Sequence, residues 1–320
     1  MEYAPIAVFA YRRLGHLRQA LDALFKNPEI KRSKLFIFSD GPKNEKQVDE
    51  IGLVRAYVSC LDHPELKIIS SERNKGLSNS IISGVSSILS KHETVIVVED
   101  DLVVAPNFLD FMNRSLDRYA PNKSILSVSG FSYPVAYPKD FSQDVILTQR
   151  FSAWGWGTWK SAWDNTDWEM KNYQSYARSW RQISKFSKIS PDLPWMLHQQ
   201  ISGQIDSWAI RWLFKHFVKD AFCLMPTRTL VKNIGLDGSG THGDSLTEDS
   251  MLRQDLKPFM NIELPDFPIF DRMIAEHIRK LHAPESFIGK AKSFLKRLFL
   301  RKGGKSLVFA EKFSNSIRKR

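Results

Sequence analysis

Short apolar segments alternate with amphipathic helical segments through the first hundred residues. The apolar runs that we expect to be strands are residues 6–11, 34–39, 66–71 and 94–98. Between them, apolar residues recur at helical spacing in residues 14–27, 44–61 and 76–91. Strands that alternate with helices predict βαβ units joined in a parallel sheet. We therefore predict an α/β fold with a Rossmann-like, mixed and mainly parallel sheet flanked by helices.

Polar side chains follow several of these predicted strands at the point where each strand ends. Asp40 follows the second strand, Arg73 and Asn74 follow the third, and Glu99 to Asp101 follow the fourth. Open α/β sheets bind their ligands outside the carboxyl ends of the strands. The sequence therefore predicts a ligand site at this edge of the sheet.

The stretch TVIVVEDDLVVAP, residues 94–106, places three consecutive carboxylates between two apolar runs. Such groups repel one another and are costly to remove from water. A divalent cation would relieve both costs, and Mg²⁺ and Mn²⁺ prefer oxygen ligands. The alternative is a solvated acidic turn, although the apolar residues on both sides disfavour it.

The stretch VIVVEDDLVVAPNFLDFM, residues 95–112, resembles the acidic motif of GT-A-fold glycosyltransferases. It is most similar to the Glu-Asp-Asp motif of the N-acetylglucosaminyltransferase I family and of related bacterial sugar transferases. The resemblance covers about residues 4–245 in the order of its parts. It implies that Asp101 binds the metal, Mn²⁺ or Mg²⁺, that bridges the donor diphosphate. It also implies that Asp100 contacts the donor ribose and Glu99 the transferred sugar.

The same resemblance assigns further residues to the nucleotide-sugar donor. It implies that Arg12 or Arg13 lies near the nucleotide and that Asp40 bonds to the uracil. It also implies that the Asn-X-Gly segment brings three residues close to the donor, namely Arg73, Asn74 and Gly76. Each has a structural alternative: a solvated helix entry for the arginines, a turn for Asp40 and a loop before a helix for the segment.

One acidic residue is a candidate general base. Inverting sugar transfer needs a base to deprotonate the acceptor hydroxyl. Asp206 in GQIDSWAIRWL is similar to the family's acidic residue before a Trp and a helix. The alternative is that Asp206 caps the N-terminus of the helix that carries Trp208 and Trp212. One residue can serve both roles.

A tryptophan-rich segment, RFSAWGWGTWKSAW, spans residues 150–163. Its Gly-Trp core resembles the loop that lines the sugar site in related bacterial transferases. Gly155 allows close backbone approach, while Trp154 and Trp156 are expected to stack on a sugar. For Trp159 and Trp163 we expect a place in the core.

A glycine-rich segment, NIGLDGSGTHGDS, spans residues 233–245 and follows Lys232. It resembles the family's flexible segment that orders over the donor and excludes water. We expect Lys232 and His242 to contact the donor, with a plain loop histidine as the alternative. The sequence departs from the family pattern at residues 241–243.

The positive charge of the chain is concentrated at its C-terminal end. Of the net charge of +11, residues 285–320 carry +9, because eleven Lys or Arg face only Glu285 and Glu311. The nearly neutral remainder argues against a nucleic-acid partner. Phe and Leu mixed with these cations, as in GKAKSFLKRLFLRKGGKS, suit an anionic membrane surface. The alternative is a solvated or disordered tail.

We divide the chain into a catalytic domain and a C-terminal extension. Residues 1–265 form the GT-A domain, with 1–101 as the nucleotide-sugar half and 102–265 as the acceptor half. Residues 266–320 form an extension with the basic amphipathic helical tail. The two cysteines, Cys60 and Cys223, form no metal or disulfide spacing and favour a reducing compartment. No leader or membrane-spanning run is recognisable, so we expect a cytoplasmic protein, peripheral on the inner membrane face.

The resemblance implies a metal-dependent, inverting glycosyltransferase that uses a nucleotide sugar, such as a uridine diphosphate sugar. The expected acceptor is a glycan or a lipid-linked glycan in bacterial surface polysaccharide or lipopolysaccharide assembly. Two alternatives stay open. One is a sugar nucleotidyltransferase, although residues 8–17 are a poor version of its phosphate loop. The other is a non-catalytic module that binds glycans or nucleotides.

Overall fold

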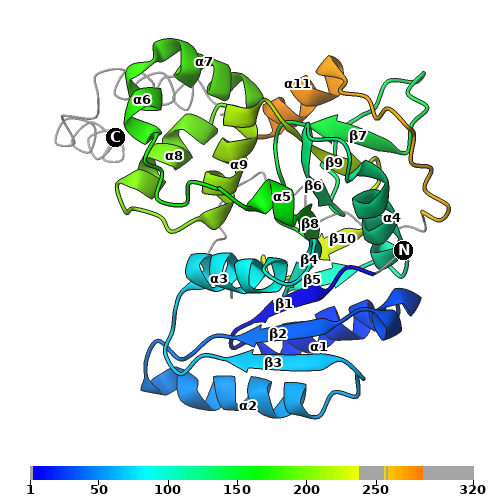
Figure 1. The fold of residues 1–320 in the computed structure, drawn as a ribbon, viewed down its shortest axis with the longest axis vertical. Coiled ribbons are helices and arrows are strands. Elements are labelled where there is room, and N and C mark those ends of the chain that lie inside the picture. The colour runs from blue at the N-terminus through cyan, green and yellow to red at the C-terminus, as the bar shows by residue number, and fades with distance from the viewer. Residues whose placement is uncertain (1–2, 238–255, 257–258, 284–320) are drawn as a thin grey trace.

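The computed structural model describes residues 3–237, 256 and 259–283. Within them, eight strands form one sheet in the order β3-β2-β1-β4-β8-β6-β9-β7 (Figure 1). The strands are β1 Ile6–Ala10, β2 Leu35–Ser39, β3 Leu66–Ser70, β4 Thr94–Glu99, β6 Ile125–Ser129, β7 Val145–Thr148, β8 Trp156–Trp159 and β9 Phe222–Pro226. A separate antiparallel ribbon joins β5 (Leu102–Val104) to β10 (Val231–Asn233).

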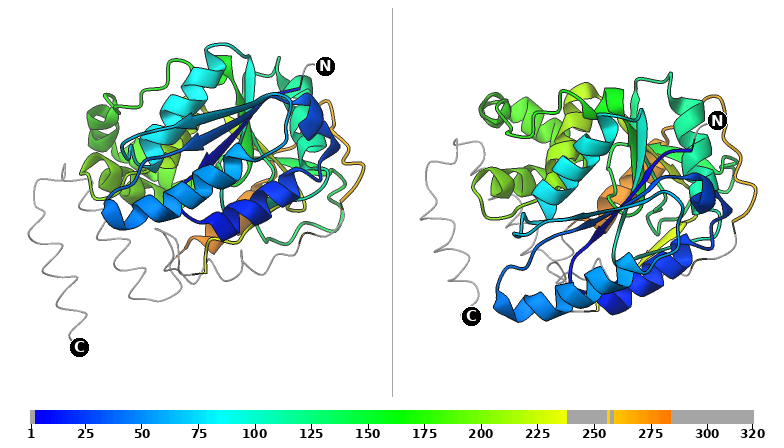
Figure 2. Two further views of the ribbon diagram at one scale, coloured as in Figure 1. Left: turned by 90° about the horizontal axis from the view of Figure 1, so that it is seen from below. Right: turned by 60° about the horizontal axis from the view of Figure 1, so that its bottom comes forward.

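The first half of the sheet is parallel throughout. Strands β3, β2, β1 and β4 lie side by side and run in one direction. Helices α1 (Leu14–Leu24) and α2 (Val48–Ser59) cover one face, and α3 (Leu77–Leu89) covers the other (Figures 1 and 2). The predicted α/β fold, with a mixed and mainly parallel sheet flanked by helices, is confirmed.

The apolar patterns explain these first elements. All five residues of β1 are buried, as expected for a parallel strand covered on both faces. Along α1, Leu17, Leu21 and Leu24 recur at intervals of four and three residues and are buried together. The short connections η1 (Pro28–Arg32) and η2 (Glu45–Gln47) are 3₁₀ turns.

The second half of the sheet is mixed. Strand β8 lies antiparallel between β4 and β6, β9 runs parallel to β6, and β7 runs antiparallel to β9 at the edge. Neither β7 nor β8 was expected from the sequence. In the described part of this half, the helices are α4 Phe108–Tyr119, α5 Lys160–Trp163, α6 Tyr173–Arg178, α7 Trp180–Ile189, α8 Leu193–Ile201, α9 Trp208–Lys219 and α11 Arg272–Leu281.

The helix that carries Trp208 and Trp212 is separated from the preceding helix by a short loop. Helix α8 ends at Ile201 and α9 begins at Trp208. Ser207 caps α9, because its side chain accepts a hydrogen bond from the backbone N–H of Ile210 at 3.4 Å. The capping role considered for Asp206 therefore belongs to its neighbour.

Residues 259–283 pack against the body of the molecule. Ile269 bridges to Ile146 beside the edge strand β7. Arg118 forms an ion pair with Asp266 at 2.7 Å. Among the described residues, none of the helices combines the length and apolarity that crossing a membrane requires. The predicted tail at 285–320 lies outside the described residues.

Candidate active site

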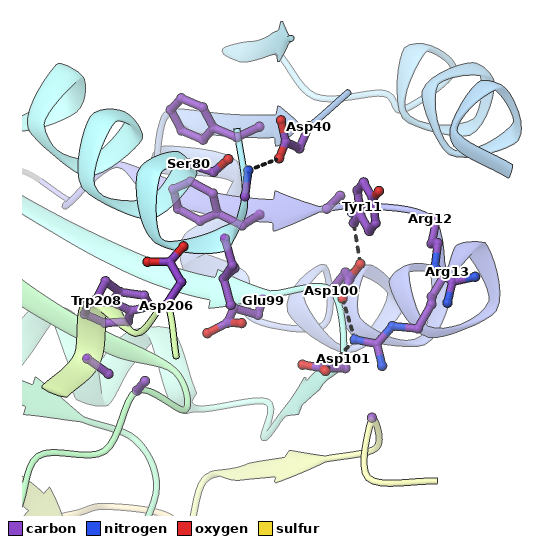
Figure 3. A pocket seen from close by; sticks show the side chains of 18 of the residues that line it. Tyr11, Arg12, Arg13, Asp40, Ser80, Glu99, Asp100, Asp101, Asp206 and Trp208 are labelled. Carbon is purple, nitrogen blue, oxygen red and sulfur yellow. Dashed lines mark hydrogen bonds and ion pairs between the residues drawn. The ribbon is translucent and has the colours of Figure 1, made fainter. Parts of the chain in front are cut away.

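A cavity of about 640 Å³ lies at the carboxyl ends of β1, β2 and β4 (Figure 3). This is the edge at which open α/β sheets bind ligands. The cavity collects most of the residues that the sequence singled out: Arg12, Arg13, Asp40, Asn74, Gly76, Glu99, Asp100, Asp101, Trp154 and Asp206. Segments from the first, second and third hundred residues therefore meet at one site.

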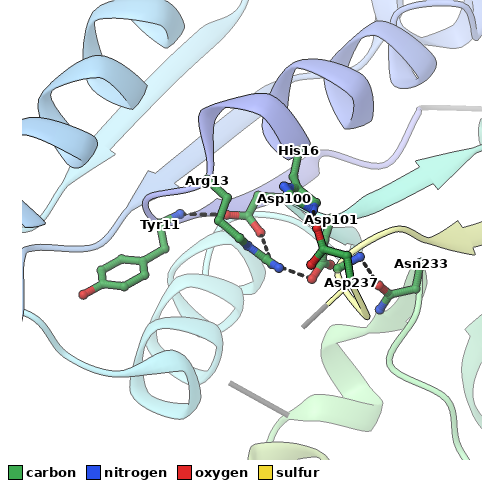
Figure 4. Close-up of polar contacts among 8 residues, drawn as sticks. Tyr11, Arg13, His16, Asp100, Asp101, Asn233 and Asp237 are labelled. Carbon is green, nitrogen blue, oxygen red and sulfur yellow. Dashed lines mark hydrogen bonds and ion pairs between the residues drawn. The ribbon is translucent and has the colours of Figure 1, made fainter. Parts of the chain in front are cut away.

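The acidic triplet is held by Arg13. Glu99 ends β4, and Asp100 and Asp101 form the turn into β5. Asp100 accepts a hydrogen bond from the backbone N–H of Tyr11 at 3.0 Å, and a second from Arg13 Nη2 at 3.0 Å. The same nitrogen lies 2.5 Å from Asp101 Oδ2 (Figure 4). One guanidinium thus contacts two carboxylates and offsets part of their charge.

Burial and crowding raise the pKa values of two of these carboxyl groups. Burial, followed by the charges of Asp101 and Asp100, raises the pKa of Glu99 to about 8. Burial and the charge of Asp101 also raise the pKa of Asp100, although Arg13 opposes the shift. The triplet is therefore a site of high negative potential that the protein only partly compensates.

The first glycine of the glycine-rich segment lies against this triplet. A Cβ atom at Gly235 would clash with Asp101 Oδ2 and lie 2.8 Å from Arg13 Nη1. The backbone N–H of Ile234 donates to the Asp101 carbonyl at 2.9 Å. Gly235 in turn donates to Asn233 Oδ1 at 2.7 Å. A side chain at Gly235 would therefore displace the side chains of Asp101 and Arg13.

Asp40 organises the neighbouring loop. Its carboxylate accepts backbone N–H groups from Gly41 at 2.9 Å, Lys75 at 2.9 Å and Gly76 at 3.1 Å. Asn74 donates to the Gly41 carbonyl at 2.8 Å. These three backbone donors hold the carboxylate in the turn that was the alternative for Asp40. The contact of Asp40 with uracil stays a prediction.

Asp206 faces this loop across the cavity (Figure 3). Its side chain is 59% exposed, and Arg211 Nη2 lies 3.3 Å from its Oδ1. Its Oδ2 would be 3.6 Å from a Cβ atom placed on Gly76. One carboxylate oxygen is thus paired and the other lies close to the Asn-X-Gly segment. The carboxylate is accessible to a ligand in the cavity.

The tryptophans divide between the cavity and the core. Trp154 lines the cavity and packs edge-on against Phe131. Trp156 was expected to stack on a sugar, but it is fully buried in β8. It stacks on Trp208 at 4.9 Å and on Trp163 at 5.7 Å. The sugar-stacking prediction for Trp156 is wrong, because β8 carries the residue into the core.

Other predicted donor residues lie away from the cavity lining. Arg73 is exposed, and Lys232 is half-buried on β10. Gly155 has a φ of +59°, and a Cβ there would lie 2.8 Å from Val231 Cγ2. Its role is therefore close packing. His242 lies outside the described residues.

Three residues that line the cavity near the ends of β1 and β2 were not expected from the sequence. Tyr11 follows β1, and its hydroxyl donates to Gln47 Oε1 at 2.5 Å. Lys43 lies in the same lining, and its N–H donates to the same Gln47 oxygen at 3.0 Å. The position of Tyr11 directly after a buried strand, beside Arg12, was the available signal.

The carboxylates of the cavity fit a cation that takes only one or two ligands from the protein and the others from bound phosphate and water. Within the described ranges, no group of three or more His, Cys, Asp or Glu side chains is arranged to hold a metal ion. Asp101 nevertheless lines the cavity beside two further carboxylates with raised pKa values. Mg²⁺-type ions are commonly held by one or two carboxylates together with substrate phosphates and water. Asp101 fits that pattern.

Comparison with known proteins agrees with the motif. The chain is 24% identical over 177 residues to an Arabidopsis thaliana enzyme named alpha-1,3-mannosyl-glycoprotein 2-beta-N-acetylglucosaminyltransferase. The match covers 51% of this chain and 39% of that enzyme, so it spans about two-fifths of the relative's length. No family model matches the chain. The expected resemblance to this class of glycosyltransferase is confirmed.

Solved structures with some likeness to the chain include glycosyltransferases. TarS 1–349 from S. aureus has a TM-score of 0.43 and 12% identity, with 96% of this chain and 75% of that chain covered. GalNAc-T7, solved with UDP, GalNAc and Mn²⁺, has a TM-score of 0.44 and 9% identity, with 70% and 42% covered. A mannosyltransferase from Pyrobaculum calidifontis, solved with GDP-Man and Mn²⁺, has a TM-score of 0.36 and 14% identity, with 67% and 74% covered.

Proposed function

We propose that the chain is a metal-dependent, inverting glycosyltransferase that uses a nucleotide sugar, with a uridine diphosphate sugar as the first candidate. One observation carries the proposal: an acidic triplet held by an arginine and an accessible aspartate, Asp206, line the same cavity. Sugar transfer needs these two centres, one for the leaving diphosphate and one for the acceptor hydroxyl.

The donor would lie along the carboxyl ends of β1, β2 and β4. Asp101 would hold Mn²⁺ or Mg²⁺, which supplies charge stabilisation for the departing diphosphate. Arg13 lies 2.5 Å from the same carboxylate, and we propose that its guanidinium also contacts the diphosphate. Asp100, fixed by Tyr11 and Arg13, would contact the ribose. Glu99, at the inner end of the triplet, would contact the transferred sugar.

The acceptor would approach from the side of Asp206. The Asp206 carboxylate takes the proton of the acceptor hydroxyl as that oxygen bonds to the anomeric carbon of the sugar. The bond from the anomeric carbon to the diphosphate breaks, and its electron pair leaves with the diphosphate. Trp154 lines the cavity and offers apolar surface to a sugar ring.

The acceptor we propose is a glycan or a lipid-linked glycan of a bacterial surface polysaccharide or lipopolysaccharide. A lipid-linked acceptor would agree with the basic residues 285–320, which suit the inner face of the cytoplasmic membrane. His242, in the glycine-rich segment, stays a predicted contact of the donor on the strength of the family resemblance.

A panel of nucleotide sugars tests the proposal. Each is added to the chain with and without Mn²⁺ while thermal unfolding is followed, because a ligand that binds only the folded state raises its stability. We expect stabilisation by a uridine diphosphate sugar that depends on Mn²⁺, followed by slow release of free sugar. Release of pyrophosphate from a nucleoside triphosphate would indicate a nucleotidyltransferase instead. Binding without turnover on any donor or acceptor would indicate a binding module.

A further inference from the structure

Helix α7 lies at the end of the molecule opposite α1 and α2 (Figure 1), and it carries a row of exposed cations. Ile183, Phe186 and Ser187 are buried on one side of the helix. Arg181, Lys185 and Lys188 recur at intervals of four and three residues and are all exposed. Residues at this spacing lie on one face of a helix. The exposed face of α7 is therefore a cationic stripe.

Few acids compensate this stripe. Residues 173–190, which contain α6 and α7, carry Arg178, Arg181, Lys185 and Lys188 and no Asp or Glu. Lys185 pairs with the exposed Asp220 at 3.3 Å, and this pair lies in water, where it contributes little. In the part of the chain that the structure describes, the other three cations form no ion pair. A surface with this imbalance attracts anions.

Helix α11 continues the cationic face. A hollow of about 130 Å³ lies between α7 and α11, and Lys188 and Arg272 both line it. The acid of α11, Glu276, is engaged by Arg279 at 2.6 Å. Helix α11 ends at Leu281, shortly before the segment 285–320 that carries a net charge of +9. The folded cationic face and the basic segment are thus adjoining parts of the chain.

Exposed apolar side chains accompany these cations. Trp180, at the start of α7, is 44% exposed. Val218, at the end of α9, is 60% exposed and precedes Lys219. An acidic protein partner would account for the cations but not for the exposed apolar side chains beside them. Tryptophan beside Lys and Arg is typical of protein surfaces that lie at the boundary between lipid headgroups and acyl chains.

We propose that the face formed by α7, the end of α9 and α11 docks on an anionic lipid surface. Its cations would contact lipid headgroups, and Trp180 would enter the headgroup layer. The proposal does not depend on the glycosyl-transfer chemistry. It adds a folded docking surface to the basic segment 285–320, which alone had suggested a membrane. Two attachments hold a protein at a membrane more firmly than one.

Vesicle sedimentation of the full chain tests this inference. Phosphatidylcholine vesicles are compared with vesicles that also contain phosphatidylglycerol. We expect the chain to bind only the anionic vesicles. The triple variant Arg181→Glu/Lys185→Glu/Lys188→Glu should bind them at least about tenfold more weakly, because each basic residue near the surface contributes about 1 kcal/mol. A matched control, Lys26→Glu/Lys31→Glu/Lys91→Glu, reverses three exposed charges elsewhere and should bind nearly as well as the unmodified chain.

Several results would overturn the proposal. Equal binding by the α7 variant and the unmodified chain would mean that residues 285–320 alone attach the chain to the vesicles. Equal losses in both triple variants would mean that only net charge matters. Retention on heparin with no binding to vesicles would identify a soluble polyanion as the ligand.

If the triple variant fails to fold, the milder Arg181→Gln/Lys188→Gln variant replaces it and should bind anionic vesicles several-fold more weakly than the unmodified chain. Quenching of Trp180 by brominated lipid should disappear in Trp180→Phe.

Discussion

Arg13 Nη2 lies 2.5 Å from Asp101 Oδ2, although 88 positions separate the two residues in sequence. The nitrogen also reaches Asp100, whereas Arg13 Nη1 is buried and has no partner among the described residues. The guanidinium therefore supplies the positive charge that the acidic triplet needs when no cation is bound.

We predict that Arg13 competes with the metal for Asp101. Arg13→Gln should bind Mn²⁺ severalfold more tightly in the absence of nucleotide, because the carboxylate loses its internal counter-ion. The same variant should bind UDP more weakly, because the guanidinium that would donate hydrogen bonds to the diphosphate is lost. Free Mn²⁺, followed by electron paramagnetic resonance, reports the first effect. For Mn²⁺ affinity, Arg12→Gln is the matched control, since Arg12 pairs with Glu50 at 3.1 Å and not with the triplet. Unchanged Mn²⁺ affinity in Arg13→Gln would refute the competition.

The base assignment predicts a loss of turnover without a loss of donor affinity. Asp206→Asn should lower kcat for transfer by roughly 10²- to 10⁴-fold, the usual contribution of a general base. Its side chain keeps the shape that contacts Arg211, so UDP binding should be retained. Asp110→Asn, at an exposed pair with Arg114, is the control. Near-normal kcat in Asp206→Asn would exclude Asp206 as the base.

Gly235 should tolerate no side chain. In Gly235→Ala the new Cβ would overlap Asp101 Oδ2 and crowd Arg13. We expect the acidic turn to shift, with a loss of at least about tenfold in metal-dependent UDP affinity and about 1 to 3 kcal/mol of stability. Calorimetric titration and urea unfolding measure the two effects. Gly15→Ala, where nothing lies within 4 Å, should keep the UDP affinity and lose no stability. Equal behaviour of the two variants would contradict the close contact at Gly235.

The raised pKa of Glu99 predicts a pH-dependent stability. Because its folded pKa is about 8 and its ordinary value is 4.5, folding favours the protonated carboxyl. The stability that this provides is complete below pH 4.5 and is lost as pH rises through about 8. Glu99→Gln should therefore gain stability relative to the unmodified chain between about pH 5 and pH 9, by about 1 to 2 kcal/mol. Urea unfolding in the presence of a chelator measures this, and a constant difference across that range would contradict the assignment.

Local patterns predicted the first half of the fold and its acidic motif. Strands β1 to β4 and helices α1 to α3 have patterns that neighbouring residues define, and the structure contains all of them. The ends of these strands predicted where the polar residues would gather. Asp101 and Asp100 could therefore be expected at one site from the strand pattern, and the family resemblance added Asp206.

The features that the sequence did not predict depend on contacts between segments that lie far apart in the sequence. Trp156 belongs to a strand whose partners, β4 and β6, lie far away in sequence, so its burial could not be inferred from its own segment. Asp40 is engaged by backbone groups of residues 75 and 76, which depend on how that loop folds back. The contact between Arg13 and the acidic turn likewise requires that β1 lies beside β4.

Calorimetric titration of UDP in the presence and absence of Mn²⁺, on the unmodified chain and on Asp101→Asn, tests the central claim most directly. We predict that UDP binds the unmodified chain much more tightly with Mn²⁺ than without it. We also predict that Asp101→Asn loses this dependence while remaining folded. UDP binding that is indifferent to Mn²⁺ and to Asp101, or no binding at all, would contradict a metal-dependent nucleotide-sugar site at the end of β4.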